Sequence, residues 1–160
     1  LDYIYYLRGL INFNEQQGWL ASLGGQDLSE RDLQAAREAF DGFREVVTRF
    51  PDSKYAADSE ARMKYLVNSM AAGEVHIARY YYKRGAYVAA INRAQLAVRQ
   101  YQQAPATEEA LYIMLKSYER LGLDELRNDT ERVMKANFPR SDLLSKGYQL
   151  DERRWWQVWK

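Results

Sequence analysis

The sequence predicts an all-α protein built from stacked pairs of helices. Two segments carry apolar side chains that advance by the same steps of three and one residues, which is the spacing of one face of an α-helix. The first face comprises Ala36, Ala39, Phe40, Phe43, Val46, Val47 and Phe50, and the second, 51 residues further on, comprises Tyr87, Ala90, Ile91, Ala94, Ala97, Val98 and Tyr101. Because one helix pair cannot bury its own apolar face, a pattern that recurs along the chain favours pairs that stack on one another.

Proline and glycine divide the chain into six expected helices. Pro51 and the turn residues Gly85 and Gly122 separate the apolar segments, whereas Gly73 lies inside one and costs only about 1 kcal/mol there. The expected helices span residues 2–14, 32–50, 53–84, 86–102, 106–121 and 124–137. Between the first two, residues 17–26 are expected to form an oversized turn, because they mix flexible glycine with apolar side chains.

A helix-turn-helix pattern covers residues 71–104 and returns 37 residues further on. Its positions in the first copy are Ala78, Tyr81, the turn at 82–87, Ala90 and Ala97. The positions in the second copy are Leu111, Met114, Tyr118, Gly122, Met134 and Pro139. The second copy is degenerate, since Arg127 and Glu131 stand where apolar residues are expected. The pattern resembles the tetratricopeptide repeat, a unit of 34 residues, and implies a right-handed solenoid.

The resemblance implies about three repeats that share one long helix. We expect a repeat domain over residues 1–140, divided at about 2–52, 53–104 and 105–140, followed by a tryptophan-rich tail at 141–160.

Composition and charge exclude several classes of protein. The 160 residues are 47% hydrophobic, 28% charged and 14% aromatic, which favours a packed chain over a disordered one. The net charge of +1 provides no overall field that would attract nucleic acid. The absence of cysteine excludes disulfides, thiol nucleophiles and cysteine-ligated zinc. Leu1 already lies inside a helical pattern, so we expect the chain to be a fragment without its natural N-terminus.

The residues that could carry chemistry form no constellation, so the sequence predicts no enzyme activity, cofactor or metal. His76 is the one histidine, which excludes metal sites built on a histidine pair, and no catalytic or phosphate-binding motif accompanies it. Carboxylates such as Asp58 and Glu109 are interpreted as solvated charge. The run Tyr80-Tyr81-Tyr82 before Lys83 and Arg84 could stack on nucleic-acid bases. Core packing is the favoured reading, because successive helical residues point about 100° apart. Tyr81 is expected in the core, whereas Tyr80 and Tyr82 are expected to be available for a partner.

A closer likeness follows from the order of several short segments. They are Tyr6-Leu7-Arg8-Gly9-Leu10, then Ala39-Phe40, then Phe50-Pro51-Asp52-Ser53-Lys54-Tyr55, then residues 80–93 with the sequence YYYKRGAYVAAINR. This order resembles the BamD (ComL) family, lipoproteins of the machinery that assembles β-barrels at the periplasmic face of the outer membrane in Gram-negative bacteria. The resemblance implies a lipid-anchored scaffold of five repeats, of which this chain would hold the last three.

The same resemblance implies the partners and their contacts. The C-terminal repeats of the family dock onto a POTRA domain of the barrel subunit BamA, and accessory lipoproteins bind as well. The arginine of the Asn-Arg pair, Arg93 here, is the expected key contact, because a guanidinium offers forked donors to a carboxylate. Arg84, Arg99 and Tyr87 complete the expected partner-binding set. The sequence leaves open whether unfolded barrel proteins also bind.

The chain departs from the family at its end, where three tryptophans enter a tail that is short and polar in other members. Trp155 and Trp159 stand one helical turn apart and would share a face. They could cap the last repeat, sit at the lipid headgroup boundary, or bind a partner together with Trp19 and Leu20.

The main alternative is a generic tetratricopeptide adaptor or co-chaperone that grips an acidic peptide through a carboxylate clamp. That clamp needs asparagine on the first helix of consecutive repeats. His76 and Ile113 stand at those positions, so the sequence disfavours this alternative.

Overall fold

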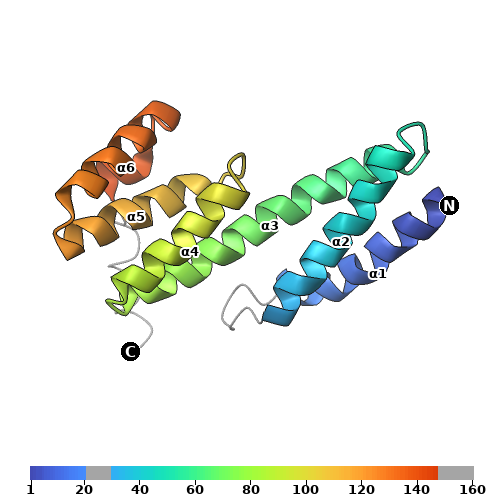
Figure 1. Cartoon of the computed structure of the whole chain (residues 1–160), viewed down its shortest axis with the longest axis horizontal. Coiled ribbons are helices and arrows are strands. Elements are labelled where there is room, and N and C mark those ends of the chain that lie inside the picture. Colours follow the sequence, from blue (N-terminus) through green and yellow to red (C-terminus); the bar gives the residue numbers. More distant parts are fainter. Residues whose placement is uncertain (21–29, 148–160) are drawn as a thin grey trace. The chain divides into compact units, whose positions relative to one another are not determined.

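The computed structural model describes residues 1–20 and 30–147, with side chains described for residues 1–13 and 33–147. This part of the chain is helical and contains no strand, as Figure 1 shows. Its helices are α1 (Asp2–Leu20), α2 (Glu30–Arg49), α3 (Ala56–Lys83), α4 (Tyr87–Gln100), α5 (Thr107–Leu121), α6 (Asp124–Asn137) and α7 (Asp142–Lys146). The predicted all-α fold is confirmed, and its helix pairs fit a tetratricopeptide-like repeat.

The predicted helix boundaries hold in the second half of the chain and fail at two places in the first. α1 continues to Leu20, so the oversized turn does not begin at Gln17, and the remainder of that predicted turn lies outside the described residues. Gly18 does not end the helix, because one glycine costs only about 1 kcal/mol. α3 begins at Ala56 instead of residue 53, because Ser53 first forms a turn: its N–H donates to the Phe50 carbonyl (3.0 Å), and its carbonyl accepts from the Ala56 N–H (3.0 Å).

The chain divides into two compact units, Leu1–Glu74 and Val75–Lys160, and α3 contributes residues to both. The division into three repeats stays a prediction. α7 is an additional helix that falls within the segment predicted as a tail.

In the first unit, α1 and α2 approach closely at a pair of glycines. A Cβ atom added to Gly42 would lie 2.7 Å from the backbone nitrogen of Gly9, and one added to Gly9 would lie 2.6 Å from the Phe43 ring. Both distances are shorter than atoms tolerate, so the backbones can meet here only without side chains. Phe43 fills the space beside the glycines and is completely buried.

A polar and aromatic network joins α1 to the start of α3. The ring of Tyr6 stacks on Tyr55 with centroids 4.5 Å apart, and its hydroxyl donates to Asp58 (2.7 Å). Arg62 donates to the same carboxylate (2.6 Å) and lies over the Phe13 ring (4.8 Å). The hydrogen bond from Arg62 is the main cause that holds the pKa of Asp58 below its usual value. The carboxylate that the sequence suggested to be merely solvated therefore organises this network.

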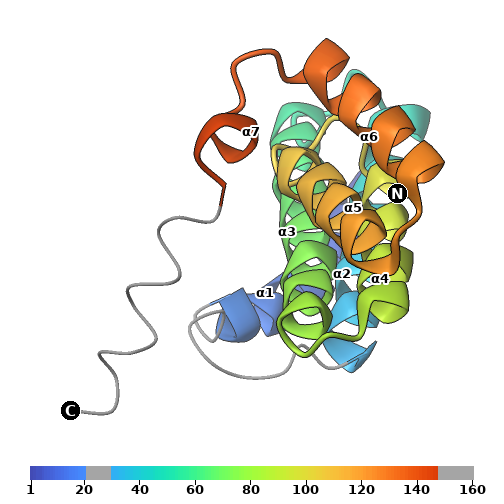
Figure 2. The same ribbon diagram turned by 90° about the vertical axis from the view of Figure 1, so that its left-hand side faces the viewer.

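In the second unit, α5 is the central helix. Figure 2 shows α5 between α4 and α6, and α7 packs on it as well. Residues on every side of α5 are buried, among them Leu111, Ile113, Leu115 and Tyr118. Two cores meet at this helix. The larger, shared with α3 and α4, comprises Val75, Ala78, Ala90, Ile91, Ala94, Ala97, Ala110, Ile113, Met114 and Tyr118. The smaller, shared with α6, comprises Leu111, Tyr112 and Met134, with Leu143 and Leu144 of α7 packed against it.

The two turns of this unit are built alike. Gly85 after α3 and Gly122 after α5 adopt φ values of +75° and +70°, a left-handed conformation that glycine reaches without steric cost. After each glycine, an N–H bonds back to a helix carbonyl: Ala86 to Tyr81 and Leu123 to Tyr118, both at 3.0 Å. α4 and α6 then follow with the same length of 14 residues, 37 positions apart. The sequence repeat therefore reappears as a repeat of helix boundaries.

We predict that Gly42→Ala lowers the free energy of unfolding by about 1–3 kcal/mol, because the new methyl group would collide with the Gly9 backbone. The intrinsic helix preference of alanine over glycine, about 1 kcal/mol, acts in the opposite direction. Urea denaturation measures the net effect. Gly85→Ala is a useful comparison, because its Cβ would meet nothing within 4 Å and only the left-handed backbone costs about 1–2 kcal/mol. A stabilised Gly42→Ala protein would contradict the close approach of α1 and α2.

We predict that Asp58→Asn weakens the dependence of stability on acid pH. Because the pKa of Asp58 is lower in the folded chain, the unfolded chain takes up the proton first. The stabilisation is complete above the ordinary aspartate pKa of about 4 and is lost as the pH falls through the lower pKa of the folded state. Urea denaturation at a series of acid pH values should show a shallower loss for Asp58→Asn than for the parent protein. Asp52→Asn, which alters an exposed carboxylate of the neighbouring turn, is the control, and equal slopes for all three proteins would refute the prediction.

Candidate protein-binding surface on helix α4

α4 carries the segment that the sequence singled out, and its buried residues are three alanines and Ile91. Ala90, Ala94 and Ala97 are completely buried and face α5, where Ala110 is also completely buried. Small side chains let the two helix backbones approach closely, as at other tight helix crossings. Apart from the buried Ile91, the larger side chains of α4 are found at its edges and on its outer face.

Arg93 lies at one edge of this alanine face. It follows Ala90 by three positions and precedes Ala97 by four, so it borders the buried stripe and is itself half-buried. Ala89 and Leu96, one turn to either side of Arg93, are also half-buried. We call Ala89, Arg93 and Leu96 the Arg93 edge. The helical spacing puts a half-buried arginine between two half-buried apolar residues on one side of α4, and an arginine in such a position suits recognition of a carboxylate.

The four residues of the predicted partner-binding set do not share one face. Tyr87, Arg93 and Arg99 are spaced six residues apart, and six steps of about 100° leave each about 120° from the next around the helix. Arg99 is exposed, whereas Tyr87 is half-buried on the opposite flank from Arg93. Arg84 belongs to the turn before α4, where its guanidinium carbon lies 5.1 Å from the centroid of the exposed Tyr80 ring. As a partner-binding set, these four residues stay a prediction.

Aromatic packing also corrects the interpretation of the tyrosine run. Tyr81 packs against the core of the second unit, as expected, but Tyr82 packs there too and is not left free for a partner. Its ring lies 5.6 Å from that of Tyr87, and a hydrogen bond with Tyr82 raises the pKa of Arg120. The tight turn at Gly85 brings Tyr87 back onto Tyr82, and sequence spacing alone does not reveal this. Tyr80 is the member of the run that is most exposed.

A salt bridge with two hydrogen bonds joins α3 to α5 in the second unit. Arg79 donates two hydrogen bonds to Glu109 of α5, at 2.6 and 2.7 Å, and both side chains are mostly buried. Glu109 is therefore not the simple solvated charge that the sequence suggested. Its partner lies 30 residues away in the chain, and for that reason helical spacing did not identify it.

The structure does not describe the side chains of the other residues predicted to bind a partner. Trp19 and Leu20 lie in the last turn of α1, but their side chains are outside the described residues, as are Trp155 and Trp159. His76 is half-buried in α3. Among the side chains that the structure describes, no three histidines, cysteines, aspartates or glutamates come together as metal ligands would. The described helices also include none with the length and apolar character needed to cross a membrane.

Comparison with known proteins gives a consistent match. The model of the YfiO family, described as an outer membrane lipoprotein, matches residues 1–133. Proteins named outer membrane protein assembly factor BamD are similar over most of the chain. The one from Neisseria meningitidis serogroup A is 50% identical over 159 residues, which are 99% of this chain and 60% of that protein. The one from Haemophilus influenzae is 38% identical over 135 residues, which are 84% of this chain and 52% of that protein. The chain thus spans between half and two thirds of the length of these two relatives.

We predict that Ala94→Leu destabilises the second unit by about 1–3 kcal/mol, because the added atoms cannot be accommodated between α4 and α5. Asn92→Leu is the matched control, since it places the same side chain on the exposed face of α4. Thermal unfolding followed by circular dichroism compares the two variants. Equal melting temperatures for both variants would show that α4 and α5 are not closely packed at Ala94.

Proposed function

Because this chain belongs to the YfiO family of outer membrane lipoproteins, we propose that it is a non-enzymatic protein scaffold that takes part in assembling outer-membrane proteins. The name shared by its relatives, outer membrane protein assembly factor, supports this role. This chain spans only 60% of the Neisseria relative, so it is part of the proposal that the chain shares the role of the complete relatives. The proposal includes a position at the periplasmic face of the outer membrane and a lipid anchor carried by the longer protein.

The proposed partner is a POTRA domain of a BamA-type barrel subunit, and the proposed contact is the Arg93 edge. The half-buried position of Arg93 beside the alanine face is the observation that supports it most directly. A partner carboxylate that meets this guanidinium would be shielded from water by Ala89 and Leu96. Charge-assisted hydrogen bonds gain strength in such surroundings, because the local dielectric is lower than in bulk water.

The remaining members of the predicted set take secondary places in this proposal. Arg84 and Tyr80 form an exposed cation and ring pair at the turn before α4, available to a partner that extends beyond the edge. Accessory lipoproteins are proposed to bind through a second surface that comprises Trp19, Leu20, Trp155 and Trp159. Unfolded barrel proteins are a further candidate class of ligand.

We predict that Arg93→Glu weakens POTRA binding by about 2–5 kcal/mol, because it replaces an attractive charge by a repulsive one at a partly desolvated contact. Arg93→Lys should also weaken binding, though less, because lysine keeps the charge and loses the planar fork of donors. Isothermal titration calorimetry with the purified POTRA domain measures both effects. Circular dichroism establishes that the variants keep their helicity.

Two matched charge reversals complete this experiment. Arg99→Glu makes the same change on another face of α4, and Arg37→Glu makes it on an exposed position of α2. If docking takes place at the Arg93 edge, Arg37→Glu binds as the parent does and Arg99→Glu loses less affinity than Arg93→Glu. Unchanged affinity for folded Arg93→Glu, or equal losses for all three variants, would overturn the assignment of the edge.

A further inference from the structure

The ion pair of Arg79 and Glu109 joins two helices that are not consecutive in the chain. α3 carries Arg79 and α5 carries Glu109, and α4 lies between them in the sequence, so no single turn holds α3 against α5. Both oxygens of the carboxylate accept a hydrogen bond from the guanidinium, at 2.6 and 2.7 Å. The side chains are only 33% and 23% exposed, so separating them would leave two charges partly removed from water. The pair therefore resists a change in the distance between α3 and α5.

α4 packs on both of these helices. The larger core of the second unit contains Val75 of α3 and Ile113 of α5, together with the buried residues of α4. Arg79 follows Val75 by one turn of α3, and Glu109 precedes Ile113 by one turn of α5. The ion pair therefore borders the core against which α4 packs, and it fixes the separation of the two helices that support α4.

The Arg93 edge lies on the side of α4 that is nearer α3. Gln95 donates a hydrogen bond to the Tyr118 hydroxyl of α5 (3.3 Å), so the flank of α4 that carries Gln95 is the one next to α5. Arg93 precedes Gln95 by two residues, which places it about 200° away around the helix. The buried face of α4, which packs on α3 and α5, lies between these two flanks. The depth at which α4 packs on α3 and α5 therefore determines how far Arg93 is exposed.

We infer that Arg79 and Glu109 are positioning residues for the Arg93 edge. By fixing the separation of α3 and α5, the pair holds α4 at the depth at which Ala89, Arg93 and Leu96 share one partly exposed side, and so preserves the affinity of this edge for a partner carboxylate. Neither Arg79 nor Glu109 needs to touch the partner. The inference rests on the proposed docking at the Arg93 edge and adds a determinant of affinity that lies outside that edge.

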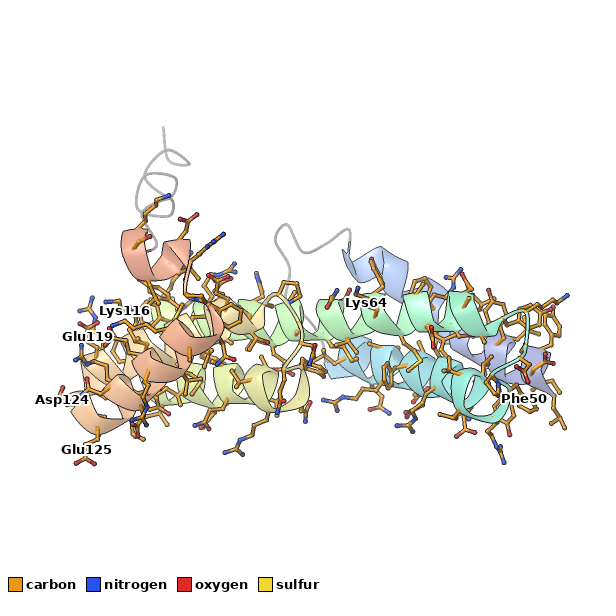
Figure 3. All side chains as sticks on the ribbon, turned by 90° about the horizontal axis from the view of Figure 1, so that it is seen from above. Phe50, Lys64, Lys116, Glu119, Asp124 and Glu125 are labelled. Carbon is orange, nitrogen blue, oxygen red and sulfur yellow. The ribbon has the colours of Figure 1, made fainter. Side chains whose placement is uncertain are left out.

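α5 also carries an ion pair within the helix itself. Lys116 donates to Glu119, three residues further along, at 2.8 Å. Figure 3 shows these two side chains together at the end of the second unit, near Asp124 of α6. Because the hydrogen bond lies within one helix, its loss leaves the distance between α3 and α5 unchanged. Glu119 is therefore a matched control for Glu109.

Isothermal titration calorimetry of the full chain with the purified POTRA domain tests the inference. Glu109→Gln should weaken binding by about 2-fold to 30-fold, the range for residues that act on a binding site without touching the ligand. Arg79→Lys should also weaken binding, because lysine keeps the charge and loses the planar fork that meets both carboxylate oxygens. The charge exchange Arg79→Glu with Glu109→Arg should restore affinity toward the parent value. Glu119→Gln should bind as the parent does, and circular dichroism establishes that each variant is folded.

A second control separates positioning from a general loss of stability. Met134→Ala removes a completely buried side chain from the core that α5 shares with α6, so it destabilises the same unit away from α3. Folded Met134→Ala should keep the POTRA affinity of the parent.

Amide hydrogen exchange, measured without the partner, reports on α4 directly. The amides of α4 should exchange faster in Glu109→Gln than in the parent protein, because α4 is held less firmly between α3 and α5. Glu119→Gln should exchange in α4 as the parent does.

Three results would overturn the inference. The first is folded Glu109→Gln that binds the POTRA domain as the parent does while Arg93→Glu does not. The second is a loss of affinity in Met134→Ala as large as that in Glu109→Gln. The third is equal exchange of the α4 amides in Glu109→Gln and the parent. Unchanged affinity for folded Arg93→Glu would instead overturn the proposed docking site itself, and with it the role of the ion pair in docking, so the two failures are distinguishable.

Discussion

Close approach of helix backbones is the constraint on which the packing of both units depends. In the first unit, α1 and α2 meet at Gly9 and Gly42, where even one methyl group has no room. In the second unit, the small alanine side chains of α4 allow the same close approach to α5. Helices that touch through such small residues gain many dispersion contacts along their backbones, and the large aromatic side chains then fill the spaces beside the crossing. Phe43 beside the glycines is an example.

This constraint also determines which side chains can serve a partner. Because alanine occupies most of the inner face of α4, the longer side chains of that helix other than Ile91 lie at its edges and on its outer face. Arg93 occupies an edge, where part of its surface is already shielded, whereas Arg99 lies on the outer face in contact with water. Two arginines on one helix therefore differ in how much hydration each would lose on binding, and partly shielded contacts tend to contribute more to affinity than exposed ones.

Much of this arrangement could be predicted from the sequence, because it rests on local periodicity. The apolar spacing gave α2, α4, α5 and α6 within two residues at each end, and the glycines at 85 and 122 marked turns whose left-handed backbone favours glycine. Contacts between distant residues were missed, since spacing carries no information about them. Asp58 and Glu109 were therefore interpreted as solvated charge, although Asp58 accepts a hydrogen bond from Tyr6 and Glu109 pairs with Arg79. The edge formed by Ala89, Arg93 and Leu96 could have been found from the interval of three or four residues around Arg93.

The central position of α5 has a consequence for synthesis on the ribosome. α5 emerges from the ribosome before α6 and α7, so Leu111 and Tyr112 exist for a time without the residues that later cover them, Met134 and Leu143 among them. A growing chain at that stage presents an apolar surface to other chains, which is the situation in which nascent proteins associate wrongly or need a chaperone. The short helix α7 therefore closes the second unit late in translation, although it is only five residues long.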